Sequence, residues 1–219
     1  MALTKYNFNS FDVTPVASNA FAFDGDADGL ATAASGSLNL IKTQTASSSA
    51  SISFIHGTSD VVFDGTYDTY MFKFISIHPQ TDSKHFSFNA TTDGTNFNVT
   101  KTSSAFGPQH DESDSDANLN YRTGNDLQQS TADQRLASEV GADGDQSLSG
   151  SLFFFSPSST VFVKHFMSNT NSGFGPNYSN QEFTGGYCNT TSAITGLKFL
   201  FNSGNIDAGT IKMYGIKKS

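Results

Sequence analysis

The sequence predicts an all-β fold, built as an antiparallel two-sheet β-sandwich. Phe stands out among the apolar residues, with 21 Phe against 7 Tyr, and it recurs in short stretches that alternate with Ser, Thr and Asn. Ser, Thr and Asn together make up 71 of the 219 residues. Ser and Asn disfavour helix interiors because their side chains compete for backbone hydrogen bonds. An all-β domain with many turns is therefore favoured over a helical or α/β domain.

The first 45 residues are predicted to form an extended N-terminal arm that leads into the first strand. Between Ser10 and Ala34, short apolar pieces alternate with Pro15, Gly25 and Gly29, and neither a period of 2 nor one of 3.6 is sustained. Such a segment buries little apolar surface by itself, so we expect it to lie on its own domain or on a neighbouring subunit. The sandwich domain is expected at residues 46–219.

Alternating apolar residues predict the first strands of the sandwich. Leu38–Leu40 and Ile52–His56 predict a first pair of strands across a Ser-rich turn. Within Tyr70–Ile77, Tyr70, Phe72 and Phe74 share one face, and Met71, Ile75 and Ile77 share the other. A strand that is apolar on both faces is covered on both faces, so this strand is expected to be central or to lie at a subunit contact.

A hairpin and a long excursion are predicted next. Phe86–Phe88 and Phe97–Thr100 flank an Asp93-Gly94 turn, which is typical of a hairpin. Residues 103–147 are the least strand-like part of the chain, and we expect them to leave one edge or end of the sheets. Within them, Thr131–Val140 has the pattern of two helical turns with Thr131 as the N-cap.

The remaining strands follow at hairpin spacing and are separated by Asn, Ser and Gly turns. They are predicted at residues 149–155, 160–167, 183–188, 197–201 and 210–216. The total of about eight to ten strands is the number that a two-sheet sandwich contains.

Charge and hydropathy exclude several classes of partner. The chain has 12 Lys and Arg against 20 Asp and Glu, a net charge of −8, which argues against binding to nucleic acid. The longest apolar run, Leu152–Phe155, is four residues long, so no membrane insertion is expected. The N-terminus lacks the continuous apolar core of a signal peptide, so a protein made in the cytoplasm is expected. The single cysteine, Cys188, is expected to be a small core residue.

One short motif has the chemistry of a calcium site. Asp24, Asp26 and Asp28, followed by Gly29, form the pattern D-x-D-x-D-G, which places three carboxylates around one turn. The closing acid of an EF-hand is missing, because Ser35 stands at its position. A looser Ca²⁺ loop and a solvated acidic turn both remain open, and no other cofactor is expected.

A second acidic run, Asp111–Asp116, follows His110. Three interpretations remain open for it: a cation site, an acidic recognition patch, and a loop that like-charge repulsion keeps in water.

No pattern in the sequence demands an enzyme. The five histidines lack metal-ligand spacing, and neither a C-x-x-C pair nor a G-x-S-x-G elbow is present. A glycan depolymerase would need two carboxylates about 5 to 10 Å apart in a groove. The candidates for such a pair are Asp126, Asp133 and Glu139.

Five segments spread over nearly the whole chain carry a resemblance to a known group of proteins. They are KYNFNSFDVTPV (residues 5–16), TASSSASISF (45–54), YDTYMF (67–72), FSPSSTVFVKH (155–165) and SGNIDAGTIKMYGIK (203–217). With these segments the chain resembles virion structural proteins of tailed bacteriophages, particularly marine ones. The resemblance implies a jelly-roll-like sandwich present in several copies on a phage particle, and it brings no catalytic residues.

The composition and the resemblance together predict a non-enzymatic virion protein. We expect an exterior module, either a tail appendage or a capsid decoration, that docks through its N-terminal arm. Its expected partners are further copies of itself, as a homotrimer, and other virion proteins. An alternative is a tail-fibre module that binds a host-surface glycan, because the loops in residues 103–147 and 169–182 combine Asn and Ser with Phe174 and Tyr178.

Overall fold

The structure is a computed structural model that describes residues 21–23, 30–32, 37–175 and 177–218. These residues form strands and no helix, which confirms the all-β prediction. The chain divides into two compact units, residues 1–37 and 38–219. In the first unit, β1 (Phe21–Phe23) pairs antiparallel with β2 (Leu30–Thr32). Most of the predicted arm lies outside the described residues.

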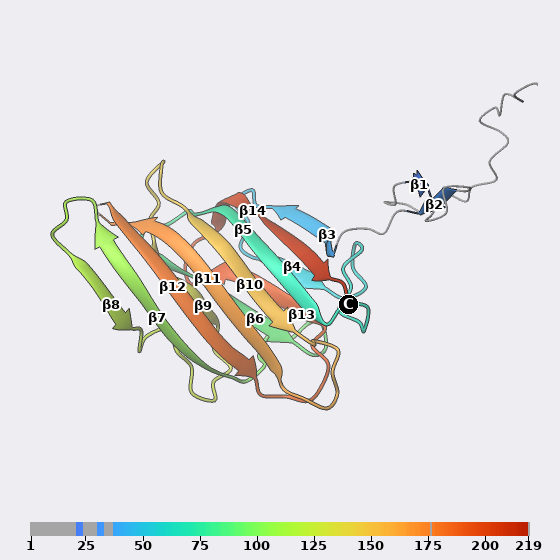
Figure 1. Cartoon of the computed structure of the whole chain (residues 1–219). Coiled ribbons are helices and arrows are strands. Elements are labelled where there is room, and N and C mark those ends of the chain that lie inside the picture. Colours follow the sequence, from blue (N-terminus) through green and yellow to red (C-terminus); the bar gives the residue numbers. More distant parts are fainter. Residues whose placement is uncertain (1–20, 24–29, 33–36, 176, 219) are drawn as a thin grey trace, which may run out of the picture. The chain divides into compact units, whose positions relative to one another are not determined.

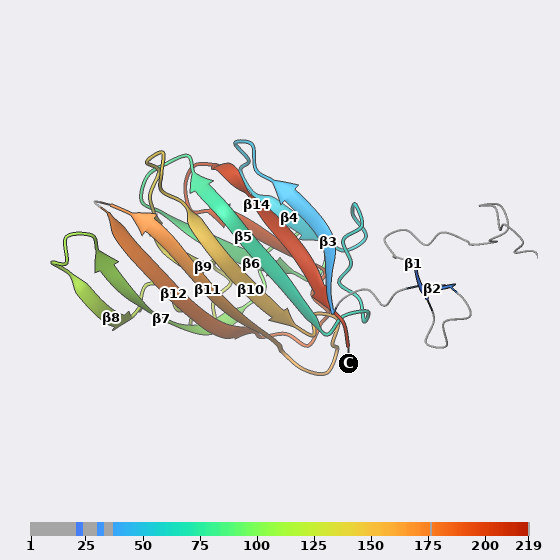
Figure 2. The ribbon, with the colours of Figure 1, turned by 45° about the horizontal axis from the view of Figure 1, so that its top comes forward.

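The second unit is a sandwich of two antiparallel sheets (Figure 1). The larger sheet contains, in spatial order, β3 (Leu38–Thr45), β14 (Ile206–Ile216), β5 (Thr69–Pro79), β10 (Leu148–Phe155), β11 (Lys164–Phe174), β12 (Tyr178–Cys188), β7 (Lys101–Asp111) and β8 (Ala117–Tyr121). The smaller sheet contains β4 (Ile52–Ile55), β13 (Gly196–Phe201), β6 (Lys84–Thr91) and β9 (Gln134–Val140). Figure 2 shows the smaller sheet behind the larger one.

Eight of these strands have the connectivity of a jelly roll. Strands β3, β14, β5 and β10 lie side by side in the larger sheet, and β4, β13, β6 and β9 form the smaller one. Numbered along the chain as one to eight, their spatial orders are 1-8-3-6 and 2-7-4-5, the two interlocked Greek keys of this fold. The other four strands, β11, β12, β7 and β8, extend the larger sheet beyond β10.

The boundary of the sandwich differs from the predicted one. β3 is hydrogen-bonded to β14 as an edge strand of the larger sheet, so the sandwich begins at Leu38 and not at residue 46. The predicted excursion at residues 103–147 is also corrected. These residues contain most of β7, all of β8 and all of β9. β7 pairs with β12 in the larger sheet, and β9 pairs with β6 as an edge strand of the smaller sheet.

Two predicted strand pairs do not form, because in each case the chain crosses to the other sheet. β3 and β4 both exist, but β3 pairs with β14 and β4 pairs with β13. The turn at Asp93-Gly94 forms, with Gly94 at a φ of +76° and Asp93 Oδ1 accepting the N–H of Asn96 at 2.8 Å. After this turn the N–H of Val99 donates to the carbonyl of Ala90 in β6 at 3.3 Å, but the pairing does not continue, and the chain enters the larger sheet as β7. Local alternation specifies a strand but not the sheet that it joins.

The predicted helical turns at Thr131–Val140 are wrong, because Gln134–Val140 is the strand β9. Ala137 pairs with Phe86 of β6, and this pairing buries Leu136 and Val140 completely. The tertiary gain from burying these side chains overrides a weak local preference for helix.

β5 is a central strand, as predicted, and lies between β14 and β10. The prediction for its faces is wrong at one position, because Ile77 is fully buried together with Tyr70, Phe72 and Phe74. The register shifts on both sides of this strand, and Ser76 has a φ of +49°. This bulge inserts one residue and turns Ile77 to the inner face.

The core between the sheets is an aromatic cluster. Phe199 of β13 is fully buried, and its ring centroid lies 5.2 Å from that of Phe72 and 5.3 Å from that of Phe74. Phe54 and Phe86 pack on the same ring from β4 and β6. The Phe content of the sequence therefore fills the space between the two sheets of the jelly roll.

The inner face of the extension is polar instead. β11 and β12 bury Ser168, Thr170, Ser172, Asn180, Glu182 and Thr184. Thr170 Oγ1 donates to the carbonyl of Leu136 at 2.5 Å, and Glu182 accepts from the N–H of Ser138 at 3.0 Å. These bonds tie the extension to β9 by hydrogen bonds where the jelly roll proper uses aromatic packing. Among the described residues, no helix is long and apolar enough to cross a membrane.

Candidate functional site

A pocket of about 320 Å³ lies at one end of the larger sheet. Its walls come from four segments that the fold brings together: His110–Glu112 at the end of β7, Asp145–Ser147 before β10, Asn171–Gly173 on β11, and Asn177–Ser179 at the start of β12. We call it the loop pocket. It draws on both segments, residues 103–147 and 169–182, in which the sequence predicted binding loops.

Hydrogen bonds brace the walls of the loop pocket against one another. The N–H of Glu112 donates to the carbonyl of Asn177 at 3.0 Å, and the N–H of Gly173 donates to the carbonyl of Ser147 at 3.1 Å. The Gln146 side chain donates to the carbonyl of Gly175 at 3.0 Å. A pocket held in this way is preformed, which lowers the entropy cost of binding a ligand.

The acidic run beside the pocket forms a closed turn. Asp111 accepts hydrogen bonds from the hydroxyls of Ser113 and Ser115 and from the N–H of Asp116, the last at 2.9 Å. These bonds, the one from Ser113 first, hold the pKa of Asp111 well below its usual range. His110 Nε2 lies 3.0 Å from Asp114 Oδ1. In the part of the chain that the structure describes, no group of three acids, histidines or cysteines is arranged to hold a metal.

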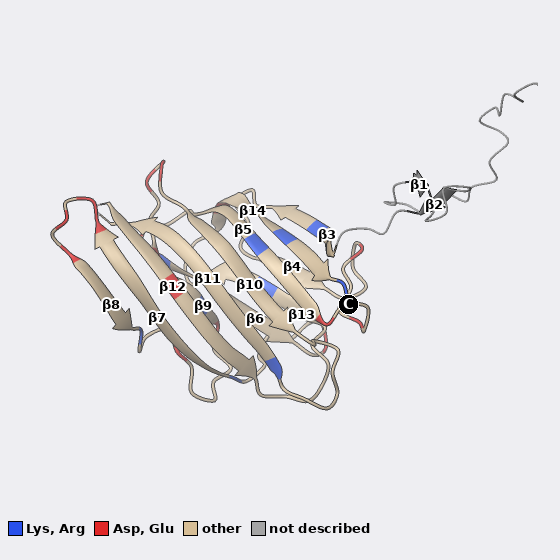
Figure 3. Cartoon of the chain, in the orientation of Figure 1, with Lys and Arg blue, Asp and Glu red and all other residues tan. Residues whose placement is uncertain are grey.

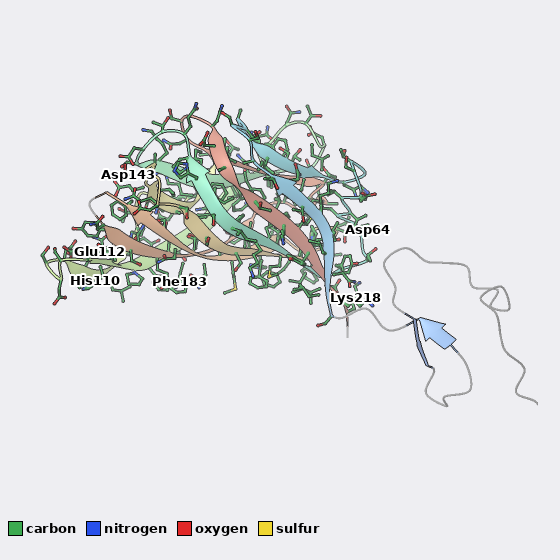
Figure 4. The ribbon with its side chains drawn as sticks, turned by 90° about the horizontal axis from the view of Figure 1, so that it is seen from above. Asp64, His110, Glu112, Asp143, Phe183 and Lys218 are labelled. Atoms are coloured by element: carbon green, nitrogen blue, oxygen red, sulfur yellow. The ribbon has the colours of Figure 1, made fainter. Side chains whose placement is uncertain are left out.

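An aromatic pair stands beside the pocket. The rings of Phe174 and Tyr178 are stacked with centroids 5.1 Å apart and planes 25° apart. Tyr178 lines the pocket, and desolvation, followed by the charge of nearby Asp116, raises the pKa of its hydroxyl. Figure 4 shows His110 and Glu112 at this same end of the sheet.

Several polar groups of the pocket have no partner among the residues that the structure describes. Ser172 is only 1% exposed and its Oγ makes no hydrogen bond. The buried Oε1 of Gln146 also makes none, but it lies against Gly141, which does not line the pocket. The side chains of Glu112, Asp145 and Asn177 make no hydrogen bond or ion pair within the described residues. Buried polar groups are almost always satisfied, so the unpaired Ser172 hydroxyl is an exception.

A second surface is the face of the larger sheet that points away from the smaller one, which we call the outer face. Exposed apolar side chains cross it: Leu38, Leu40, Phe106, Leu119, Tyr121 and Met167. Phe106 and Phe183 are directly opposite on β7 and β12, and their rings stack with centroids 5.1 Å apart. Figure 4 shows Phe183 projecting from this face. These side chains extend from β3 at one edge of the sheet to β8 at the other.

The charge on the outer face is sparse and basic. Lys73 of β5 and Lys212 of β14 are directly opposite each other. Figure 3 shows Lys and Arg on strands that include β5 and β14, whereas acidic residues gather on loops such as the β7–β8 hairpin. Two like charges directly opposite each other are unfavourable.

The three acids proposed for a depolymerase lie outside the lining of the loop pocket. Asp126 accepts from the hydroxyl of Tyr121 at 2.8 Å, and Asp133 accepts from the Asn89 amide at 2.8 Å. Glu139 is exposed on β9, and none of the three lines the loop pocket. Asp24, Asp26 and Asp28, the predicted calcium motif, lie outside the described residues.

Two features of the interior were not predicted. Lys101 is fully buried, and its Nζ donates to Asn89 Oδ1 and to the carbonyl of Val99, both at 2.7 Å. Burial lowers its pKa to about 8. Cys188, buried as predicted, has a thiol pKa that burial raises to about 12, so it is inert as a nucleophile. The second feature is Glu182, which is buried on β12. Its only sequence signal is its position between Asn180 and Thr184, which are buried on the same face of this strand.

No protein-family model matches the chain, and comparison with curated proteins and with solved structures gave no significant match.

Proposed function

We propose that the chain is a non-enzymatic structural module that assembles into a homotrimer through the outer face of its larger sheet. The observation that carries the proposal is the band of exposed apolar side chains on that face, in which Phe106 is 48% exposed and Met167 is 60% exposed. Subunit interfaces are rich in aromatic residues and Met and poor in charge at their centre, and the outer face shares this composition.

A second copy of the chain has the chemistry to cover this face. The chain carries a net charge of −8, and the first 37 residues contain four Asp against one Lys, together with four Phe. Acidic and apolar chemistry of this kind complements a face that carries apolar side chains and the Lys73–Lys212 pair. In this proposal the first 37 residues tether one copy to the next and dock the assembly on its particle, and contacts of one copy on the next close as a ring.

The particle that we propose for this trimer is the virion of a tailed bacteriophage, with the chain as an exterior tail appendage or capsid decoration. Two observations support this. The five sequence segments described above resemble virion structural proteins, and the jelly-roll strand order is one that capsid proteins use.

Two experiments test the proposal. Multi-angle light scattering of the purified chain at micromolar concentration is expected to give about 70 kDa, the mass of three 23.4 kDa chains. A monomer mass under these conditions would refute the trimer. Antibody labelling of purified phage particles in electron micrographs tests the location, and particles that carry no label would refute a virion role.

A further inference from the structure

We infer that the loop pocket is a binding site for an uncharged saccharide, an activity that goes beyond the proposed structural role. The inference starts from the Ser172 hydroxyl. It is 1% exposed, it lines the pocket, and it has no hydrogen-bond partner. A hydroxyl both donates and accepts, so a hydroxyl of the ligand is the group that satisfies it.

The rest of the lining matches a ligand that carries many hydroxyls. Hydroxyl and amide side chains dominate the walls, among them Ser147, Asn171, Asn177 and Ser179. Beside them the Tyr178 ring, stacked on Phe174, offers the apolar surface against which the C–H face of a sugar ring packs. Asn171 Nδ2 already donates to Ser179 Oγ at 3.0 Å, but a mainly apolar ligand would leave the Asn177 amide unpaired, which is unfavourable. The pocket volume of about 320 Å³ is at the lower end for small-molecule sites and suits one or two sugar rings.

The charge of the pocket selects among saccharides. Glu112 and Asp145 line it and make no ion pair within the described residues, and no Lys or Arg is among the lining residues. Free carboxylates repel an acidic sugar and accept hydrogen bonds from the hydroxyls of a neutral one. Neutral and N-acetylated sugars are therefore the expected ligands, and sialic or uronic acids are not.

The experiment uses the full chain and a panel of neutral, N-acetylated and acidic mono- and disaccharides, with binding followed by NMR of the ¹⁵N-labelled protein. We expect at least one neutral or N-acetylated sugar to bind with a millimolar or lower dissociation constant and to shift the amide signals of residues 171–175 and 177–179. The Ser172→Ala variant is expected to lower the affinity about tenfold, the effect of one lost hydrogen bond. It should not lower the melting temperature, because the hydroxyl that it removes is unpaired in the free protein.

Thr184→Val is the matched control. Thr184 is also buried on the inner face of the extension with an unpaired hydroxyl, but it does not line the pocket. This variant is expected to keep the affinity of the wild type. The inference is overturned if the panel contains no binder, if an acidic sugar binds best, or if Ser172→Ala and Thr184→Val bind equally.

Discussion

Replacement of Phe106 by Ser is the sharpest test of assembly through the outer face. Phe106 is 48% exposed on β7, where its ring stacks on Phe183, and its neighbours Ser103 and Ser104 show that Ser fits this strand. The substitution removes an apolar side chain from the surface that we propose to be covered by another copy. The fold should survive it, because the side chain is outside the aromatic core.

The expected magnitude follows from the exposed area. A Phe side chain offers roughly 200 Å², so a 48% exposed one adds about 100 Å² to a contact that covers it. At about 25 cal/mol per Å² this burial contributes about 2.5 kcal/mol. Phe106→Ser is therefore expected to weaken each subunit contact by roughly 60-fold. Within one copy, the lost stacking on Phe183 costs about 1 kcal/mol of unfolding free energy.

Sedimentation equilibrium of wild type and variant measures the association constant directly, and a thermal melt of each confirms folding. Phe162→Ser is the control, because Phe162 is 72% exposed but lies in the connection between β10 and β11, outside the sheet. It is expected to leave the trimer intact. Equal association of wild type and Phe106→Ser would show that the outer face is not the contact.

Three further predictions address the interior, the sheet and the N-terminal segment. The pKa of Lys101 is about 8 in the folded chain against 10.5 in the unfolded one, so between these pH values only the unfolded chain holds the proton and stability rises with pH, by about 3 kcal/mol. Denaturant titrations at the two ends of this pH window should show that the unfolding free energy rises in the wild type and does not rise in Lys101→Met. An equal rise in both proteins would contradict the lowered pKa of Lys101. A Cβ on Gly150 would lie 2.4 Å from the carbonyl oxygen of Asn169, so Gly150→Ala is expected to lower the unfolding free energy by about 1–3 kcal/mol, whereas Gly144→Ala, with open space around it, should leave the melting temperature unchanged. Deletion of residues 1–35 should leave the melting transition of the sandwich unchanged, because residues 38–219 form their own compact unit. The deletion should abolish incorporation into particles. Truncated protein in purified virions would disprove the tethering role.

Strand positions were the most predictable part of the fold. Tyr70, Phe72 and Phe74 were predicted to share one face of their strand, and all three are buried in β5 as the period of 2 requires. The prediction placed only Ile77 on the wrong face, because the bulge at Ser76 inserts a residue. A bulge of this kind depends on the partner strands, so it cannot be predicted from a local sequence pattern.

Strand pairing was much less predictable. The Asp93-Gly94 turn forms with the expected hydrogen bonds, yet the chain leaves it toward the other sheet. Likewise Gln134–Val140 has enough helical character to predict helix, and becomes a strand because β6 offers an open edge and the core offers burial for Leu136. Both outcomes depend on contacts between residues that are distant in the sequence.

The candidate site was predictable only as chemistry. The sequence indicated that loops rich in Asn, Ser and aromatic residues suit a saccharide, and Tyr178 is indeed a wall of the loop pocket. It did not single out Ser172, because 31 serines are present and nothing in the pattern marks the one whose hydroxyl is buried without a partner.

The sequence by itself determined that this protein is all-β, Phe-rich between its sheets, weakly charged and without a recognisable catalytic motif, because composition and a period of 2 act on neighbouring residues. Only the tertiary structure decided the jelly-roll order, the four-strand extension with its polar interior, the exposed band on the outer face and the four-walled pocket. Each of these is set by which distant segments pair, and that choice is made by the burial and hydrogen bonding of the whole chain.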